Sequence, residues 1–232
     1  SQIQSAIDRG VQYLSNAQTE NGSWISYKSR YCSFDKKIEQ PRVYPTLIIL
    51  YALQHTRYEK DTFYQKGMQY IKDVMDENYL WSIDGKNHEM TYAFDRIPCF
   101  VDPDIDTTST ALILLGPSLN LEKENYIQIK KLFDDKILTQ NGLYRTYLQG
   151  YYNKKSCPQY DYNNQPSLGA NIHLLCFFEK YNLYSTLLSL GLQNSVLEKE
   201  YWKKAVYYRS LPYLTYLCTK AIENNAYSAQ HL

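Results

Sequence analysis

Segments that are apolar on every side alternate along this chain with segments that are apolar on one side only. A helix without a polar face must be surrounded by other helices, whereas an amphipathic helix can lie between the core and water. The sequence therefore predicts an all-α fold in which outer helices cover buried inner ones. The inner helices are predicted at residues 43–55, 107–115, 168–178 and 211–222, and the outer ones at residues 2–18, 62–75, 123–138 and 184–207.

The order of outer helix then inner helix recurs about every 50–60 residues, as in a repeat protein. A single repeat cannot bury its own inner helix, so neighbouring repeats must stack and share a core. If the stack curves, about four helical hairpins form an α/α toroid in which all the inner helices begin at one end. A straight solenoid is the alternative, although its repeats are normally spaced more evenly than these.

Composition limits the classes of function. No linker rich in Pro, Gly or Ser divides the chain, so we expect residues 1–232 to form one domain. The 25 basic and 24 acidic residues are mixed along the chain, which argues against a nucleic-acid-binding surface. No apolar run is long enough to span a membrane. Five cysteines without CxxC spacing favour a reducing, cytoplasmic compartment.

The first outer segment and the turn after it contain a recognisable motif. Residues 9–24, RGVQYLSNAQTENGSW, resemble the QW repeat of squalene-hopene and oxidosqualene cyclases. In physical terms, Gln18 at the end of a helix can bond the exposed carbonyls there, while Trp24 packs over the same end. A degenerate copy spans residues 66–81, with Met75 in place of the glutamine, and residues 142–144 resemble a third.

A second motif lies where an inner helix is predicted to begin. Asp104-Ile105-Asp106-Thr107 is similar to the DxDD(T) motif of class II terpene cyclases, with Thr107 in place of the last aspartate. Threonine at this position is familiar in shorter bacterial proteins of the prenyltransferase/squalene-oxidase-repeat family, which the chain resembles. The resemblance implies an α/α toroid like the β-domain of class II cyclases. A complete barrel has about six hairpins, so about four would leave it incomplete.

The resemblance also implies a reaction, the cyclisation of a linear prenyl or isoprenoid chain started by protonating an alkene. Asp106 would be the general acid. Asp104 would hold a proton on the pair through like-charge repulsion and hydrogen bonding, and Thr107 would orient the two carboxyl groups. A purely structural interpretation competes with this one, because Asp104 makes a good N-cap and Asp106 suits the positive end of the helix dipole.

Side chains at the starts of the inner helices are the predicted substrate contacts. Aromatic faces stabilise cations, so the candidate cavity-lining residues are Tyr44, Phe100, Tyr208 and Tyr213. Ordinary packing is the competing interpretation for each of them. Asn171 is a candidate polar contact, and the alternative for it is a hydrogen bond to a neighbouring turn. His173 lies among apolar residues and is assigned no role.

No metal site is predicted. The Asp-x-Cys pair of zinc-dependent protein prenyltransferases and the DDxxD motif of class I terpene synthases are both missing from the sequence. We therefore expect no cofactor, with Mg²⁺ entering only together with a diphosphate substrate. Two other functions stay open. One is a noncatalytic toroid that binds an isoprenoid, a lipid or a protein partner, and the other is a chain whose cavity a second domain or subunit completes.

Overall fold

The computed structural model describes residues 2–29, 37–41, 43–85, 90–91, 98–152, 164–197, 215–217 and 219. These residues are mostly helical, as the sequence predicts. The helices are α1 (Gln2–Ala17), α2 (Val43–Leu53), the short 3-10 helix η1 (Arg57–Lys60), α3 (Thr62–Asp73), α4 (Ile105–Leu119), α5 (Lys123–Ile137), α7 (Leu168–Lys180) and α8 (Thr186–Leu197).

The predicted helices match the observed ones to within a few residues at each end, up to α7. The last two predictions are only partly covered. Helix α8 occupies the first half of the segment predicted at 184–207, and the rest of that segment lies outside the described residues. Of the helix predicted at 211–222, residues 215–217 and 219 are described, and they are helical.

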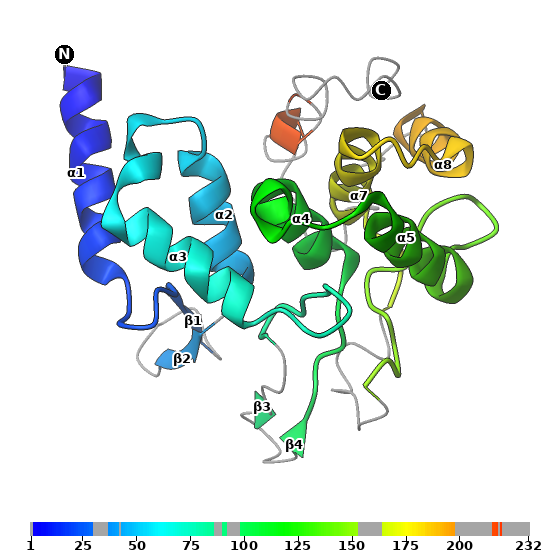
Figure 1. The fold of residues 1–232 in the computed structure, drawn as a ribbon, viewed down its shortest axis with the longest axis horizontal. Helices are drawn as coiled ribbons and strands as arrows, with labels where there is room; N and C mark the ends of the chain where they lie inside the picture. The colour runs from blue at the N-terminus through cyan, green and yellow to red at the C-terminus, as the bar shows by residue number, and fades with distance from the viewer. Residues whose placement is uncertain are drawn as a thin grey trace.

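Two small β-hairpins were not predicted. Strands β1 (Ile25–Ser29) and β2 (Lys37–Pro41) pair antiparallel with Ile25 opposite Pro41, and β3 (Met90–Thr91) pairs with β4 (Pro98–Cys99). Both hairpins follow a turn and precede an inner helix, and Figure 1 shows them on the same side of the helices. Apolar and polar residues alternate through β1, which is a strand signal that a search for helical periodicity passes over.

Inner and outer helices are distinguished by burial, as expected. Every residue of α4 from Ile105 to Gly116 is buried, and so is every residue of α7 from Leu168 to Phe178. Helix α4 packs against both α2 and α7. In contrast, Val11 is the single buried residue of α1. Burial is therefore greatest in α4 and α7 and least in α1.

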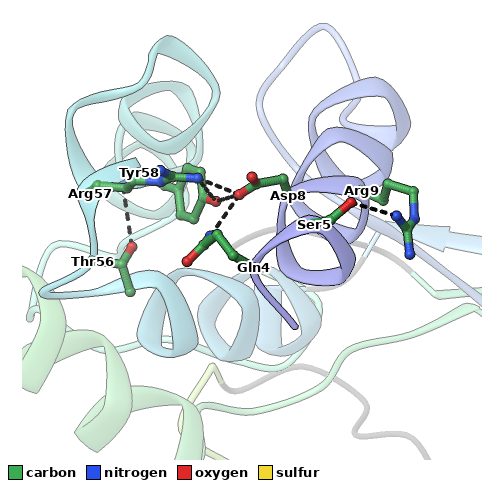
Figure 2. Close-up of polar contacts among 7 residues, drawn as sticks. All are labelled: Gln4, Ser5, Asp8, Arg9, Thr56, Arg57 and Tyr58. Carbon is green, nitrogen blue, oxygen red and sulfur yellow. Dashed lines mark hydrogen bonds and ion pairs between the residues drawn. The ribbon is translucent and has the colours of Figure 1, made fainter. Parts of the chain in front are cut away.

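The helices succeed one another across the molecule, with α1 at one end, α4 near the middle and α8 at the other end (Figure 1). Polar contacts hold α1 to the chain that precedes α3 (Figure 2). The Asp8 carboxylate accepts hydrogen bonds from Arg57, from the Tyr58 hydroxyl and, at 2.9 Å, from Gln4 Nε2. Among the described residues, no helix combines the length and apolar character needed to cross a bilayer.

Candidate functional site

The inner helices α2, α4 and α7 begin in one connected region. Val43, the first residue of α2, donates its N–H to the carbonyl of Ile83 (2.8 Å), which lies in the connection to α4. Ile105, the first residue of α4, donates to the carbonyl of Thr146 (3.0 Å), which lies in the connection to α7. The starts of α2 and α4 are thus each bonded to the repeat that follows.

An aromatic residue in each of three turns is bonded to the first turn of the next inner helix, an arrangement we call a turn clamp. The backbone N–H groups of the aromatic residues donate to side-chain oxygens of the helix, Trp24 to Thr46 Oγ1 (3.0 Å), Trp81 to Thr108 Oγ1 (3.0 Å) and Tyr144 to Asn171 Oδ1 (2.7 Å). In the second and third clamps the side chain also donates back to the aromatic residue's carbonyl, at 3.1 and 2.8 Å. The clamps satisfy buried backbone groups that would otherwise lack partners.

The same aromatic side chains reach back to the preceding outer helix. The indole Nε1 of Trp24 donates to the carbonyl of Leu14 (2.8 Å), and that of Trp81 donates to the carbonyl of Ile71 (2.7 Å). This confirms the expected role of the tryptophan. The glutamine differs from expectation, because Gln18 Nε2 donates to the carbonyls of Gly22 (2.9 Å) and Phe63 (2.8 Å). Gln18 therefore joins its turn to the next outer helix instead of closing the end of its own.

Asp104 is the N-cap of α4. Its Oδ1 accepts from the Thr107 N–H (2.7 Å), and its Oδ2 pairs with the Thr107 hydroxyl (2.8 Å). Its own backbone N–H donates to the carbonyl of Trp81 (3.1 Å). Thr107 is thus oriented toward Asp104, and the carboxyl has the capping role that competes with a catalytic one.

Asp106 faces His173 of the neighbouring inner helix. The contact joins Asp106 Oδ1 to His173 Nδ1, and Thr110 Oγ1 lies 3.4 Å from the same nitrogen. Both side chains are almost fully enclosed, with exposed fractions of 6% for Asp106 and 5% for His173. A carboxyl–imidazole pair in a dry environment can hold and transfer a proton.

Burial changes the acidity of the neighbouring carboxyl. Desolvation, with a further contribution from the charge of Asp106, raises the pKa of Asp104 to about 8, although hydrogen bonds from Thr107 oppose the rise. A carboxyl with this pKa is largely protonated at neutral pH. The start of α4 therefore retains a proton, and it retains it on Asp104, which the resemblance makes the tuning partner of the acid.

A buried hydroxyl on the same part of α4 has no protein partner. Ser109 Oγ lies three residues after Asp106, is fully enclosed and makes no hydrogen bond within the structure described here. Leaving a buried hydroxyl unpaired costs about 1–3 kcal/mol. Residues three apart occupy neighbouring positions on a helix surface, so Ser109 is next to Asp106 on the surface of α4.

The remaining predicted site residues have different outcomes. Asn171 is fully buried, and its amide bonds the backbone of Tyr144 and the carbonyl of Ser167 (2.9 Å), which is the turn-bonding alternative raised for it. Tyr44 is half-buried in the first turn of α2, and Phe100 is half-buried ahead of α4. Tyr208 and Tyr213 lie outside the described residues. The substrate contacts assigned to these aromatic residues stay predictions.

The contact of His173 with Asp106 was not predicted, since His173 was assigned no role. A histidine in an apolar helix usually packs in the core, and nothing adjacent to it in sequence marks it as different. Its partner Asp106 is 67 residues away. Only the register between α4 and α7 brings the two together, so the missing information was tertiary.

A cavity of about 440 Å³ lies between α5 and the segment that follows turn residue Tyr144. The described part of its lining combines apolar side chains with two cations and includes no acidic residue; it comprises Leu132, Lys136, Ile137, Arg145, Leu148, Gln149, Gly150, Tyr151 and Asn164. Asp102 supports one wall by accepting from the N–H groups of Gly150 (2.9 Å) and Tyr152 (3.2 Å). Within the described ranges, no group of three or more His, Cys, Asp or Glu residues is arranged to hold a metal.

Comparison with known proteins supports the fold alone. No protein-family model and no curated protein matches the sequence. Among solved structures, the crystal structure of a protein from Actinoplanes is similar, with a TM-score of 0.52 and 14% sequence identity. The match covers 82% of this chain and 52% of that one, so this chain spans about half the length of the Actinoplanes protein.

Proposed function

We propose that this protein is a terpene cyclase-like enzyme that starts the cyclisation of a linear isoprenoid by protonating an alkene. The observation that carries the proposal is the enclosed group formed by Asp104, Asp106 and His173 at the start of two inner helices. Transfer of a proton to an alkene needs a strong acid and the exclusion of competing water. The low exposure of all three residues meets the second requirement.

Each residue has a defined part in the proposed step. Asp106 gives its proton to one alkene carbon, which leaves a cation on the adjacent carbon. Attack by a second alkene forms the ring bond, and loss of a C–H proton ends the reaction without a co-reactant. A His173 Nδ1–H that donates to Asp106 Oδ1 leaves the other oxygen to carry the acidic proton, and it stabilises the carboxylate that remains. Asp104, which keeps its proton and is bonded to Thr107, adds no negative charge beside the carboxylate that remains.

The proposal includes the α/α toroid and the apolar substrate. Alternating inner and outer helices whose inner members begin in one region support a curved stack, and the half-buried Tyr44 and Phe100 lie near that region. The cavity beside Lys136 and Arg145 offers cations for a diphosphate group if the substrate carries one.

The test is incubation of the purified protein with linear prenyl diphosphates of several lengths and with squalene, followed by mass spectrometry of extracted products. We expect cyclic products from the wild-type protein and at least about 100-fold less from Asp106→Asn. The matched control is Asp76→Asn, which alters another buried carboxyl, one that accepts hydrogen bonds from the N–H groups of Asn78 (2.9 Å) and Leu80 (2.8 Å). If folded Asp106→Asn has unchanged turnover, Asp106 is not the general acid.

A noncatalytic toroid that binds a lipid is the second candidate. It is favoured by the structural bonds of Asp104, Thr108 and Asn171, which explain several polar residues without chemistry. A lipid that co-purifies equally with wild-type protein and Asp106→Asn, and is recovered unchanged, would support this candidate over the enzyme.

A further inference from the structure

The cavity beside α5 has two cations where it meets an adjoining cavity. Lys136 is in the last turn of α5, and Arg145 lies beside the end of the same helix, because the Arg145 N–H donates to the carbonyl of Ile137 (2.9 Å). Both residues also line the adjoining cavity, which has a volume of about 710 Å³ and extends past Thr139 and Gln165. The backbone hydrogen bond therefore brings two cations that are separate in sequence to one shared opening.

Neither cation is neutralised by a neighbouring acid. Among the described residues, Lys136 and Arg145 form no ion pair. The nearby carboxylate of Asp134 is engaged elsewhere, since it bonds Lys130 Nζ (2.5 Å) and the Tyr144 hydroxyl. The described lining of the two cavities includes no acidic residue. Two positive charges beside a cavity without a counter-charge attract an anion.

Away from the cations the lining becomes apolar. Leu132 lies one turn before Lys136 on the same face of α5, and Leu132 and Tyr151 also line a third cavity of about 360 Å³ that continues along the helix past Ile129. This face of α5, from Ile129 to Lys136, spans roughly 10 Å. The third cavity includes Glu77, which would repel an anion. A ligand with one charged end is therefore oriented with that end at the cations and its apolar part along α5.

Hydrogen bonds fix the wall that faces α5. The Asn164 amide bonds the backbone N–H and the carbonyl of Tyr147, both at 2.8 Å, and the Leu148 N–H donates to the carbonyl of Pro103 (2.9 Å). The volume of the cavity, about 440 Å³, is within the range of small-ligand sites, about 300–1,000 Å³. The cavity is therefore formed by the fold itself and has the size of a site for a small molecule.

We propose that this cavity binds a phosphate monoester of an apolar alcohol, with the phosphate between Lys136 and Arg145 and the chain against Leu132 and Tyr151. A phosphate monoester carries about −1.5 to −2 charges at pH 7, which the two cations balance. The Arg145 guanidinium can bond two phosphate oxygens at once, and Lys136 supplies a point charge. The site does not use Asp106, so this proposal is independent of the reaction proposed above.

The test is isothermal titration calorimetry of the full chain with octyl phosphate, kept below its micelle concentration, and with three comparison ligands. Octanol lacks the charge, inorganic phosphate lacks the chain, and butyl phosphate has a shorter chain. We expect octyl phosphate to bind one to one, and butyl phosphate to bind at least about 20-fold more weakly, because each buried methylene adds to the affinity. If octyl phosphate does not bind, or binds no better than octanol or inorganic phosphate, the proposal is wrong.

Substitutions show whether the two cations form the site. The double substitution Lys136→Gln with Arg145→Gln should raise the dissociation constant of octyl phosphate at least about 30-fold, because it removes the charge-assisted hydrogen bonds. Lys131→Gln is the matched control, since Lys131 is exposed on α5 and lines neither cavity, and it should leave the affinity unchanged. A double variant that binds like the wild-type protein, or a control that weakens binding as much, contradicts the assignment.

A final pair of measurements identifies the source of the phosphate. Phosphatidylcholine vesicles that contain phosphatidic acid present the same phosphate monoester on a bilayer surface, where the chains are not free to enter the cavity. We expect these vesicles not to sediment the protein. Sedimentation that requires both cations, without binding of octyl phosphate, would make a membrane surface the ligand and overturn the proposal. Asp106→Asn should bind octyl phosphate as tightly as the wild-type protein, so this proposal and the proposed reaction fail separately.

Discussion

At the scale of single residues, Asp104 combines a structural and an electrostatic role. It caps α4 through Thr107, and its burial favours the neutral form. A group whose pKa is higher in the folded than in the unfolded protein binds more protons when folded. Its contribution therefore favours the folded state below about pH 4 and is lost as the pH rises toward the folded pKa of about 8.

We predict that Asp104→Asn weakens this pH dependence. Asparagine can still cap the helix, but it does not titrate. The wild-type free energy of unfolding should fall by more than about 1 kcal/mol between pH 5 and pH 8 through this group, and the fall should be smaller in the variant. Urea unfolding at the two pH values measures the difference. If the free energy of unfolding changes equally with pH in the two proteins, Asp104 is already ionised in the folded state.

Local sequence was enough to find one half of the candidate site. Asp104 and Asp106 were identified because capping residues and a paired-carboxylate motif are both readable over a few neighbouring positions. Thr46, Thr108 and Asn171 hold the turn clamps, yet the sequence gives no direct sign of which backbone group each one bonds. His173 needed the packing of α7 on α4. Local patterns therefore predicted the helix start and left its tertiary partners unknown.

At the scale of helices and turns, two glycines with the same sequence context have different surroundings. Gly67 is in close contact with Leu50 and Trp24, whereas Gly10 has open space around it. Alanine is more favourable than glycine within a helix by about 0.5–1 kcal/mol when its methyl group fits.

We predict opposite effects of alanine at these positions. Gly10→Ala should stabilise the protein by about 0.5–1 kcal/mol, and Gly67→Ala should destabilise it by about 1–3 kcal/mol through overpacking. The measurement is urea unfolding at about 1 μM protein, which keeps association low. If both substitutions stabilise the protein, Leu50 and Trp24 leave room for a methyl group on residue 67.

The turn clamps give a second comparison at this scale. Thr108→Val removes an acceptor from the Trp81 N–H and a donor to its carbonyl, so it should cost about 2–3 kcal/mol. Thr62→Val, at an exposed position in the first turn of α3, should change the unfolding free energy by less than about 0.5 kcal/mol. Similar costs at the two positions would mean that the clamp contributes little.

Helix periodicity explains why the elements themselves were predictable. Charged faces on α3 and α5 are strong signals over three or more turns, and so is the near absence of charge in α4, where Asp106 is the one charged residue, and in α7 before Glu179. The β-hairpins are short and lie in connections between helices. Alternation of apolar and polar residues over so few positions does not distinguish a strand from an irregular loop. The turns could also be predicted in part, because Gly22 and Gly142 each precede an aromatic residue by two positions. The structure gives both glycines positive φ values, 91° and 82°.

At the scale of the whole molecule, burial decreases from the middle of the row toward α1. Helices α4 and α7 are enclosed along most of their length, whereas α1 has one buried residue, Val11, and is bonded through Asp8 and through the carbonyl of Leu14. In repeat proteins each unit is stabilised mainly by its neighbours, so an end unit opens more readily.

We predict that hydrogen exchange is fastest in α1 and slowest in α4 and α7. Asp8→Asn should increase exchange in α1 without changing α4, because it weakens the bonds to Arg57 and Tyr58 (Figure 2). Asp73→Asn is the control, since the side-chain bond that Asp73 makes among the described residues stays within α3, from Gln69 Nε2 (2.8 Å). Uniform exchange across all the helices would indicate a single cooperative unit.

The fit of Gly22 against α3 also bears on where the chain can be divided. A Cβ atom there would lie 2.3 Å from the carbonyl oxygen of Lys66, so the first turn is in direct contact with the second outer helix. Cutting the chain between α2 and α3 would separate these surfaces, although the cut falls in an ordinary connection. The two fragments, 1–55 and 56–232, should therefore associate in solution and restore the native fold, as the fragments of a split reporter protein do.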